Sequence, residues 1–392
     1  MRRRHSNLLL RMESIREVAG LVAHRGRAAG TDAERRAAVY LRDRLEDLGR
    51  PAELHTVDVF PRFGLTHALH AVLAILGSVL AIATAPIGAA IVLFALLSTF
   101  LDVTGATHLV RRTTGRRLSQ NVESRVEQGK PGTLVLVAHY DAPREAPSFA
   151  LATRLLRDPW LVMVVAMVLV LICAGLRVAG LEGSALTGVQ FVPTVLLILM
   201  VPALADVELS GTGAGTTDNA AGVAVVLQLA DELGERLDHF DVWVVLTGAQ
   251  GPFALGMRAW LRLRRANLER ESTVVLNVDG VADGPVTFSR REGPVLALPT
   301  HRQLRRICEE IAADGGHEAR SRVIHGAGDA GAALARGLPA VTVSSPGTML
   351  DPASLDLVFE FCRELAERVD AEVGPSLATI PRRAARPAVT QE

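Results

Sequence analysis

The stretch "GTLVLVAHYDAP" at residues 132–143 decides the fold, because it combines a buried strand with reactive side chains at its end. Its unbroken apolar run is typical of a strand that is covered on both faces. The run stops abruptly at His139 and Asp141, two groups that bind metals or protons. A lone His-x-Asp is more often an ordinary strand end, so its partners elsewhere in the chain must decide.

Helix and strand patterns alternate on either side of this stretch. Helices are predicted at residues 32–49, 219–234, 301–316 and 352–369, and strands at 52–60, 132–141, 241–248, 272–280, 285–290 and 338–345. Such alternation predicts an α/β domain with a mixed, largely parallel central sheet and helices on both faces. Ligands of such sheets bind at the carboxyl ends of the strands, so polar residues there are expected to converge.

Two apolar blocks interrupt this pattern and account for a hydrophobic content of 49%. The first, from Phe63 to Leu101, contains no Asp, Glu, Lys or Arg and is divided by "TAPIGA" at 84–89. The second runs over residues 159–176 and 183–205. They predict two transmembrane helical hairpins, at 63–105 and 158–206. Buried core helices are the alternative, because each half of the first block is short for a span, but a soluble domain rarely has four such stretches.

The arginines predict how these hairpins lie in a membrane. The opposite connections carry only Arg177. The connections on the side of the globular part carry seven arginines: Arg62, Arg111, Arg112, Arg116, Arg117, Arg154 and Arg157. By the positive-inside rule, we expect a multi-pass protein of the cell membrane with a cytoplasmic globular domain. The start "MRRRHSNLLLR" has too short an apolar stretch for a signal peptide, in agreement with this placement. A transporter is disfavoured, because the apolar stretches hold no central ionisable residue.

The predicted domain organisation follows from these blocks. The α/β domain comprises residues 8–62, 106–157 and 207–371, and residues 372–392, rich in Pro, Ala and Arg, are expected to be a disordered tail. The chain has 42 basic and 42 acidic residues, so no net charge attracts it to nucleic acid. Its three cysteines are far apart and are expected to be buried thiols in a reducing compartment.

Polar residues stand at several of the predicted strand ends. His139 and Asp141 follow one strand, Asp218 precedes a helix, Gln250 follows "VWVVLTGA" and Asp279 follows "VVLNV". Each has an ordinary explanation as a helix cap, a turn residue or a surface amide. Together, one histidine and two carboxylates from separate strand ends form the ligand set that zinc prefers, with a fourth position left for water.

At these residues the sequence resembles the aminopeptidase-type zinc exopeptidases with two co-catalytic metals, whose relatives include leucyl aminopeptidases, glutamate carboxypeptidase II, glutaminyl cyclases and the transferrin receptor. "VAHYDAP" is similar to their His-x-Asp strand end, "TTDNAAGVAVVLQLA" to their Asp-Asn-Ala-x-Gly helix start, and "NVDG" to their third ligand strand. "GDAGAALARGLPAVTV" at 328–343 resembles their last motif. The resemblance covers residues 8 to about 60 and 118–371, and its specificity lies in the order of the motifs.

The resemblance implies that His139 and Asp279 bind one zinc ion and that Asp218 bridges to a second. Asp141 would orient His139 from behind. The family's general base and a ligand of the second zinc fall on Gln250 and Gly251 in this chain, and its final histidine ligand aligns with Ala330. One zinc ion is therefore conceivable and two are not expected. His325 and Asp329 lie near the lost ligand in sequence as potential substitutes.

Two functions follow from this departure. The first is a membrane-embedded pseudo-peptidase that serves as a binding or scaffold module, with a peptide or a membrane protein as partner. The second is a working zinc aminopeptidase or related amide hydrolase that uses a single metal. An amide at position 250 cannot accept a proton from water near neutral pH, which favours the first.

Overall fold

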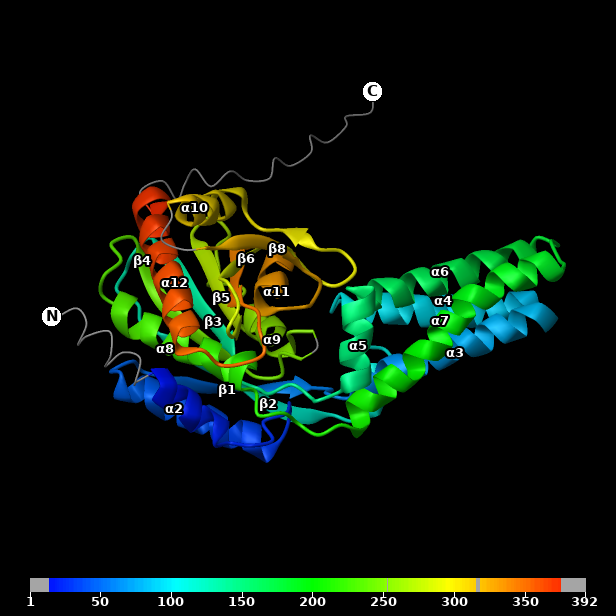
Figure 1. The fold of residues 1–392 in the computed structure, drawn as a ribbon, viewed down its shortest axis with the longest axis horizontal. Helices are drawn as coiled ribbons and strands as arrows, with labels where there is room; N and C mark the ends of the chain where they lie inside the picture. Colours follow the sequence, from blue (N-terminus) through cyan, green and yellow to red (C-terminus); the bar gives the residue numbers. More distant parts are fainter. Residues whose placement is uncertain (1–13, 252, 315–317, 375–392) are drawn as a thin grey trace, which may run out of the picture.

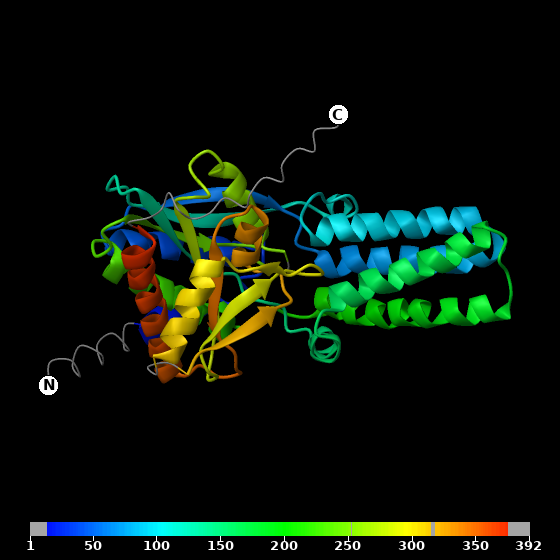
Figure 2. The same ribbon diagram turned by 90° about the horizontal axis from the view of Figure 1, so that it is seen from above.

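The computed structural model describes residues 14–251, 253–314 and 318–374. Figures 1 and 2 show a globular α/β domain from which a bundle of four helices projects at one end. All but the first three residues of the predicted tail 372–392 lie outside the described residues, as do residues 8–13 of the predicted domain. Cys173, Cys308 and Cys362 are free and buried.

The described strands form a single sheet. Its order is β1-β2-β4-β3-β5-β9-β6-β7, and β8 pairs with β6. The strands are β1 (Glu53–Val59), β2 (Arg117–Arg125), β3 (Gly132–His139), β4 (Phe240–Thr247), β5 (Thr273–Val281), β6 (Thr287–Glu292), β7 (Leu298–Pro299), β8 (Arg320–Ile324) and β9 (Ala340–Ser345). The central strands β4, β3, β5 and β9 are parallel, and antiparallel pairs join them on both sides. The mixed α/β fold is thus confirmed, with parallel pairing concentrated in the centre of the sheet.

Strand β3 shows why residues 134–138 of the opening stretch are all apolar. Leu134 and Leu136 belong to the apolar core on one face of the sheet, and Val135 and Val137 to the core on the other. Both faces of the strand are therefore dry. The first core includes residues of α2 (Asp32–Asp47), α8 (Ala221–Leu233), α10 (Arg302–Ala313) and α12 (Pro352–Glu372), and the second includes residues of α9 (Leu255–Leu263) and α11 (Asp329–Ala335).

The bundle consists of α3 (Phe63–Ala83), α4 (Ala85–Val103), α6 (Pro159–Val178) and α7 (Ser184–Leu209). Among the described residues, these four helices are long and apolar enough to cross a membrane. Helix α3 packs on α4 and α7, and α6 packs on the same two helices. Gly77 and Gly88 allow α3 and α4 to approach closely, because a Cβ atom on either would collide with the other helix. Many large apolar side chains of the bundle point outward and are exposed.

A buried polar group and an aromatic group join the bundle to the domain. The carboxylate of Asp102, near the end of α4, accepts hydrogen bonds from Nε and Nη2 of Arg111, and both side chains are buried. The guanidinium of Arg111 lies over the ring of Phe253, 4.8 Å from its centroid. Phe253 also contacts Trp160 of α6 and His67 of α3. These contacts attach the segment that follows β4 to both hairpins.

Candidate metal centre

Three of the predicted site residues meet at the carboxyl edge of the sheet. His139 ends β3, Asp279 lies near the end of β5, and Asp218 lies in the turn before α8. Nε2 of His139 is 3.0 Å from Oδ1 of Asp218 and 3.3 Å from Oδ1 of Asp279. One ligand atom from each residue lies within 4.8 Å of the others. The structure therefore brings together groups that are 140 positions apart at most in the chain.

Asn219 holds the turn of Asp218 against the strand of Asp279. Its side-chain Nδ2 donates to the carbonyl oxygen of Val278 at 2.8 Å, and its Oδ1 accepts from the backbone N–H of Gly280 at 3.0 Å. These two bonds bracket Asp279 in β5. The Asp218–Asn219 peptide bond is cis. The two sequence motifs "DNA" and "NVDG" are thus parts of one structural unit.

Asp141 orients the imidazole of His139 from the other side. Nδ1 of His139 is 3.3 Å from Oδ1 of Asp141 and 3.2 Å from its carbonyl oxygen. Nε2 is therefore the nitrogen that faces the other two carboxylates. Burial disfavours a charged imidazole, but the surrounding carboxylates of Asp141, Asp218 and Asp279 raise the pKa of His139 well above its ordinary value.

The trio fits a zinc ion. Zinc bonds to histidine nitrogen and carboxylate oxygen are about 2.1 Å long, which in a tetrahedron separates ligand atoms by about 3.4 Å. The distances from Nε2 of His139 to Asp218 and Asp279, 3.0 and 3.3 Å, are close to this value. Asp141 supplies the carboxylate that commonly supports a zinc-bound histidine.

The segment after β4 carries Gln250 and Gly251, on which the sequence resemblance places the family's general base and a ligand of its second zinc. Its three successive backbone N–H groups are held by separate side chains: that of Gly248 by Asn121, that of Ala249 by Glu34 and that of Gln250 by Asp141. Ala249 adopts a positive φ of 48°. The backbone is therefore firmly placed, and Gln250 and Gly251 line the same pocket as His139 and Asp218.

Gly251 has room for a larger side chain. A Cβ atom placed on it would meet nothing within 4 Å. Ala330, in contrast, is completely buried in the core between the sheet and α9 and α11. The structure therefore has room for a carboxylate side chain at position 251, and steric crowding does not explain the glycine there.

The two potential substitutes differ in where they lie. His325 is half exposed and contacts Asp158, which precedes α6, with Nδ1 3.8 Å from its Oδ2. It does not join the trio. Asp329 is buried, and its Oδ2 accepts a hydrogen bond of 2.5 Å from the hydroxyl of Thr247. Burial raises the pKa of Asp329 to about 7.

Buried glutamates around the site were missed by sequence reasoning. Glu34 accepts from Gly30 N–H, Ser119 Oγ and Ala249 N–H, and burial raises its pKa to about 8. Glu292 accepts from Thr342 Oγ1 and Gly331 N–H, and burial raises its pKa to about 7. "TDAE" at 31–34 matches a capping box, which suggests a local role for Glu34 but not its contact with residue 249.

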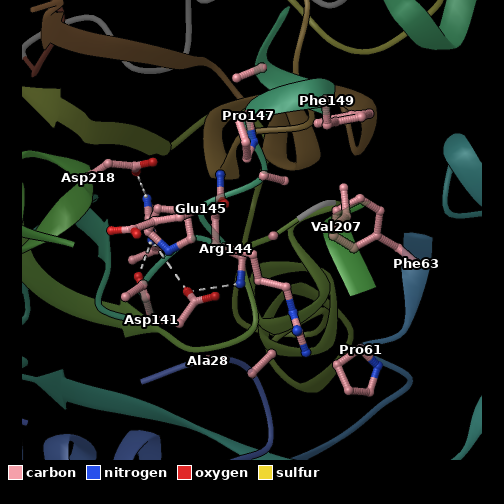
Figure 3. A pocket seen from close by; sticks show the side chains of 18 residues that line it. Ala28, Pro61, Phe63, Asp141, Arg144, Glu145, Pro147, Phe149, Val207 and Asp218 are labelled. Carbon is pink, nitrogen blue, oxygen red and sulfur yellow. Dashed lines mark hydrogen bonds and ion pairs between the residues drawn. The ribbon is translucent and has the colours of Figure 1, made fainter. Parts of the chain in front are cut away.

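A pocket of about 460 Å³ opens beside the trio. Figure 3 shows Asp141 and Asp218 on one side of it and Pro61, Phe63 and Val207 on the other. Glu145 also lines this pocket, and its carboxylate is a further acidic group that the motifs did not point to. The size is in the range of small-molecule sites.

Comparisons with known proteins bear on the fold that carries this site. Residues 199–358 match the family model of peptidase family M28. The chain has an M28 peptidase-like fold. This match includes Asp218, Gln250, Gly251, Asp279 and Ala330 and begins after His139. A search of curated proteins found no match.

Solved structures of the M28 type cover nearly the whole chain. A leucine aminopeptidase precursor from Bacteroides thetaiotaomicron has 11% identity and a TM-score of 0.51, over 91% of this chain and 96% of that one. A glutaminyl cyclase from Porphyromonas gingivalis has 14% identity and a TM-score of 0.51, over 92% and 98%. A Zn-dependent exopeptidase from Parabacteroides distasonis has 11% identity and a TM-score of 0.50, over 92% and 98%. At these identities the similarity defines the fold alone.

Proposed function

We propose that this chain is a membrane-embedded pseudo-peptidase of the M28 type, which binds a peptide or amide ligand at a single zinc ion without hydrolysing it. The observation that carries the proposal is the assembly of His139, Asp218 and Asp279 beside a pocket that Gln250 and Gly251 also line, the two residues to which the sequence resemblance assigns the positions of a base and a ligand. The metal-binding half of the site is assembled, and the proton-accepting half has an amide where the resemblance expects a carboxylate base. Binding without turnover is the chemistry that such a site supports.

The residues of the site divide the work as follows. His139, Asp218 and Asp279 would hold the zinc ion, and Asp141 fixes the imidazole that bonds to it. Zinc, when bound, polarises a carbonyl group and acidifies water. Gln250 offers a hydrogen-bond donor and an acceptor to a ligand in the pocket but has no useful basicity. Loss of a general base costs a hydrolase about a hundred- to ten-thousand-fold in rate.

The membrane part of the proposal rests on α3, α4, α6 and α7. Their exposed apolar side chains would be costly in water and favourable in lipid. Seven arginines flank the ends of both hairpins that adjoin the domain, whereas at the opposite ends Arg177 lies in the last turn of α6, next to the connection of residues 179–183. This distribution supports a cytoplasmic domain that rests against the inner leaflet of the cell membrane.

A working single-zinc aminopeptidase or amide hydrolase is the second candidate. The observation that favours this candidate is the carboxylate of Glu145, which lines the same pocket as His139 and Asp218. Such a carboxylate, within reach of a water molecule, could take the role that Gln250 cannot fill. Substitution of Glu145 by Gln separates the two functions, because it removes a base and leaves the trio unchanged.

The decisive experiment measures metal content and hydrolysis on the same purified protein. We expect about one zinc ion per chain, lost in Asp218→Ala and kept in Asp47→Ala, whose carboxylate is exposed at the end of α2. A panel of fluorogenic amino-acid amides should yield no turnover above buffer. Hydrolysis that Asp218→Ala and Glu145→Gln both abolish would overturn the pseudo-peptidase in favour of the second candidate. Absence of zinc from the wild type would overturn both.

Restoring the lost groups provides a complementary test. The triple substitution Gln250→Glu, Gly251→Glu and Ala330→His should raise zinc content toward two ions per chain. Position 251 accepts a side chain freely, whereas a histidine at the buried position 330 should cost about 1–3 kcal/mol of stability through overpacking. A folded triple variant that still binds one zinc would show that these three positions are not the missing half of the site.

A further inference from the structure

The pocket has two chemically distinct halves. One half contains polar groups of the candidate metal centre, His139, Asp218 and Gln250. The other half is largely apolar and includes Phe63, the first residue of α3, and Val207 near the end of α7, while the charged residues Arg144 and Glu145 also line the pocket. A ligand that fills both halves must itself have a polar end and an apolar end.

Helix α5 (Pro147–Leu156) forms part of the apolar wall and is placed at the domain end of the bundle. It runs across the long axis of the four bundle helices (Figure 1) and packs against α6 and α7. Pro147, Phe149 and Ala150 line the pocket. On its free surface, Leu151 and Leu155 are 57% and 72% exposed.

This helix has the features of an element that lies in a membrane interface. None of its residues is buried, large leucines are exposed on it, and arginines stand at positions 154 and 157. Exposed leucines beside arginines suit the boundary between headgroups and acyl chains. Because α5 is at the base of apolar helices that would span the bilayer, its exposed surface would lie at the headgroup level. The pocket wall and the membrane surface then share one helix.

We propose that the pocket binds a single-chain amphiphile of the N-acyl amino acid type, which enters from the membrane beside α5. Its carboxylate and amide would face Gln250 and the zinc ion that His139 and Asp218 would hold, and its acyl chain would lie along Phe63, Phe149 and the neighbouring apolar wall. The inference rests on the proposed function for the polar end and for entry from the membrane. The apolar end rests on the wall itself.

Trp160 provides a built-in reporter for this ligand. Its ring is 5.8 Å from that of Phe149 and 6.3 Å from that of Phe63, centroid to centroid, and both phenylalanines line the pocket. A brominated acyl chain in the apolar half would come close enough to quench its fluorescence. We would titrate the zinc-loaded full chain in detergent micelles with N-dodecanoylglycine that carries bromine on the chain, using Trp160→Phe to identify the signal of this residue.

The matched variants are Ala150→Glu and Thr153→Glu. Both positions are exposed on α5, but Ala150 lines the pocket and Thr153 does not. A charge in the apolar wall should weaken saturable quenching at least about tenfold in Ala150→Glu and less than twofold in Thr153→Glu. N-acetylglycine should compete at least about a hundredfold more weakly than N-dodecanoylglycine, because each buried methylene strengthens binding about fourfold. Equal zinc content in both variants serves as the control for folding.

The outcomes separate this inference from the proposed function. Quenching that does not saturate, or that is the same in the two variants, would overturn the amphiphile site even if one zinc ion binds. Equal competition by the two glycine derivatives would overturn it as well. If zinc is absent but chain-length-dependent quenching persists, the proposed function fails and the apolar half of the site stands.

Discussion

Truncation of Phe253 to alanine should loosen the candidate metal centre from a distance. Phe253 is completely buried and has three aromatic or cationic neighbours, Trp160 at 5.2 Å, His67 at 5.5 Å and the guanidinium of Arg111 at 4.8 Å. Removal of a buried phenylalanine ring costs about 3–5 kcal/mol. Part of this loss should fall on the segment that Phe253 anchors, residues 248–254.

The contact path from this ring to the metal is short. The backbone N–H of Gln250, three positions before Phe253, donates to Oδ1 of Asp141 at 3.1 Å, and Asp141 orients His139. Loss of an orienting partner of a metal ligand typically lowers metal affinity about 10- to 100-fold. We therefore expect Phe253→Ala to weaken zinc binding by that factor, measured by competition with a chromophoric chelator. Hydrogen exchange at residues 248–250 should accelerate by at least about tenfold, equivalent to 1.4 kcal/mol of local opening.

Phe288→Ala is the matched control for this prediction. Phe288 is buried to a similar degree and stacks on Phe361 in the core, away from the bundle. Its truncation should lower global stability by a similar amount without a selective change at residues 248–250 or in zinc affinity. If both variants gave the same exchange pattern and the same zinc affinity, the aromatic contact with the bundle would not be what holds the segment.

Three further substitutions test other parts of the structure. Asp141→Asn should lower zinc affinity about 10- to 100-fold in the same chelator assay while leaving the fold intact by circular dichroism. Asp102→Ala removes the carboxylate that pairs with the buried guanidinium of Arg111 and should lower the free energy of unfolding in detergent by about 3–5 kcal/mol. The control Asp58→Ala removes an exposed ion pair with Arg116 and should lower it by less than about 1 kcal/mol. Burial raises the pKa of Glu292 from 4.5 to about 7, so the unfolded chain loses this proton at a lower pH than the folded chain does. The free energy of unfolding should therefore fall by up to about 3 kcal/mol as the pH rises from 4.5 to about 7. In urea unfolding curves, Glu292→Gln should reduce this dependence on pH.

The parts of the fold that the sequence predicts are those whose signal is local. Strand β3 is an apolar run because both of its faces are covered, and the four bundle helices are recognised as long apolar stretches without charged residues at their centres. The assembly of His139, Asp218 and Asp279 could be predicted because each stands at an element end on one edge of the sheet. Parallel order then brings such ends together.

Strand β2 (Arg117–Arg125) was missed because its stabilising partners are remote. Its buried side chains include Asn121 and Glu123, which a sequence pattern assigns to a surface loop. Asn121 bonds the backbone of Gly248 and Gly256, and Glu123 accepts from Trp260. Each polar group is satisfied by a residue more than 100 positions away, so no local window contains the compensation.

The same distinction explains why the metal trio was found and its supports were not. Glu34 and Phe253 act on the segment 248–254 through contacts that join α2, β4 and the bundle, and neither carries a metal-ligand motif. Their contribution depends on which elements the fold places side by side, and propensity and spacing do not encode this. Glu145 was overlooked for a related reason, since it is one carboxylate in a connecting segment.

The structure holds the backbone at positions 248–250 with three separate side chains, and the proposed function takes Gln250 and Gly251 to stand where a hydrolase would carry carboxylates. Asn121, Glu34 and Asp141 each hold one successive N–H group, so the backbone at positions 248–250 pays little entropy when a ligand arrives. Such preorganisation strengthens the binding of a ground-state ligand as much as that of a transition state. Acceleration requires an interaction that is stronger in the transition state, and in the proposed pseudo-peptidase the interaction that is lost would be proton transfer to a base at position 250. A site with this combination retains affinity and loses turnover, and this is why metal content and hydrolysis must be measured on the same sample.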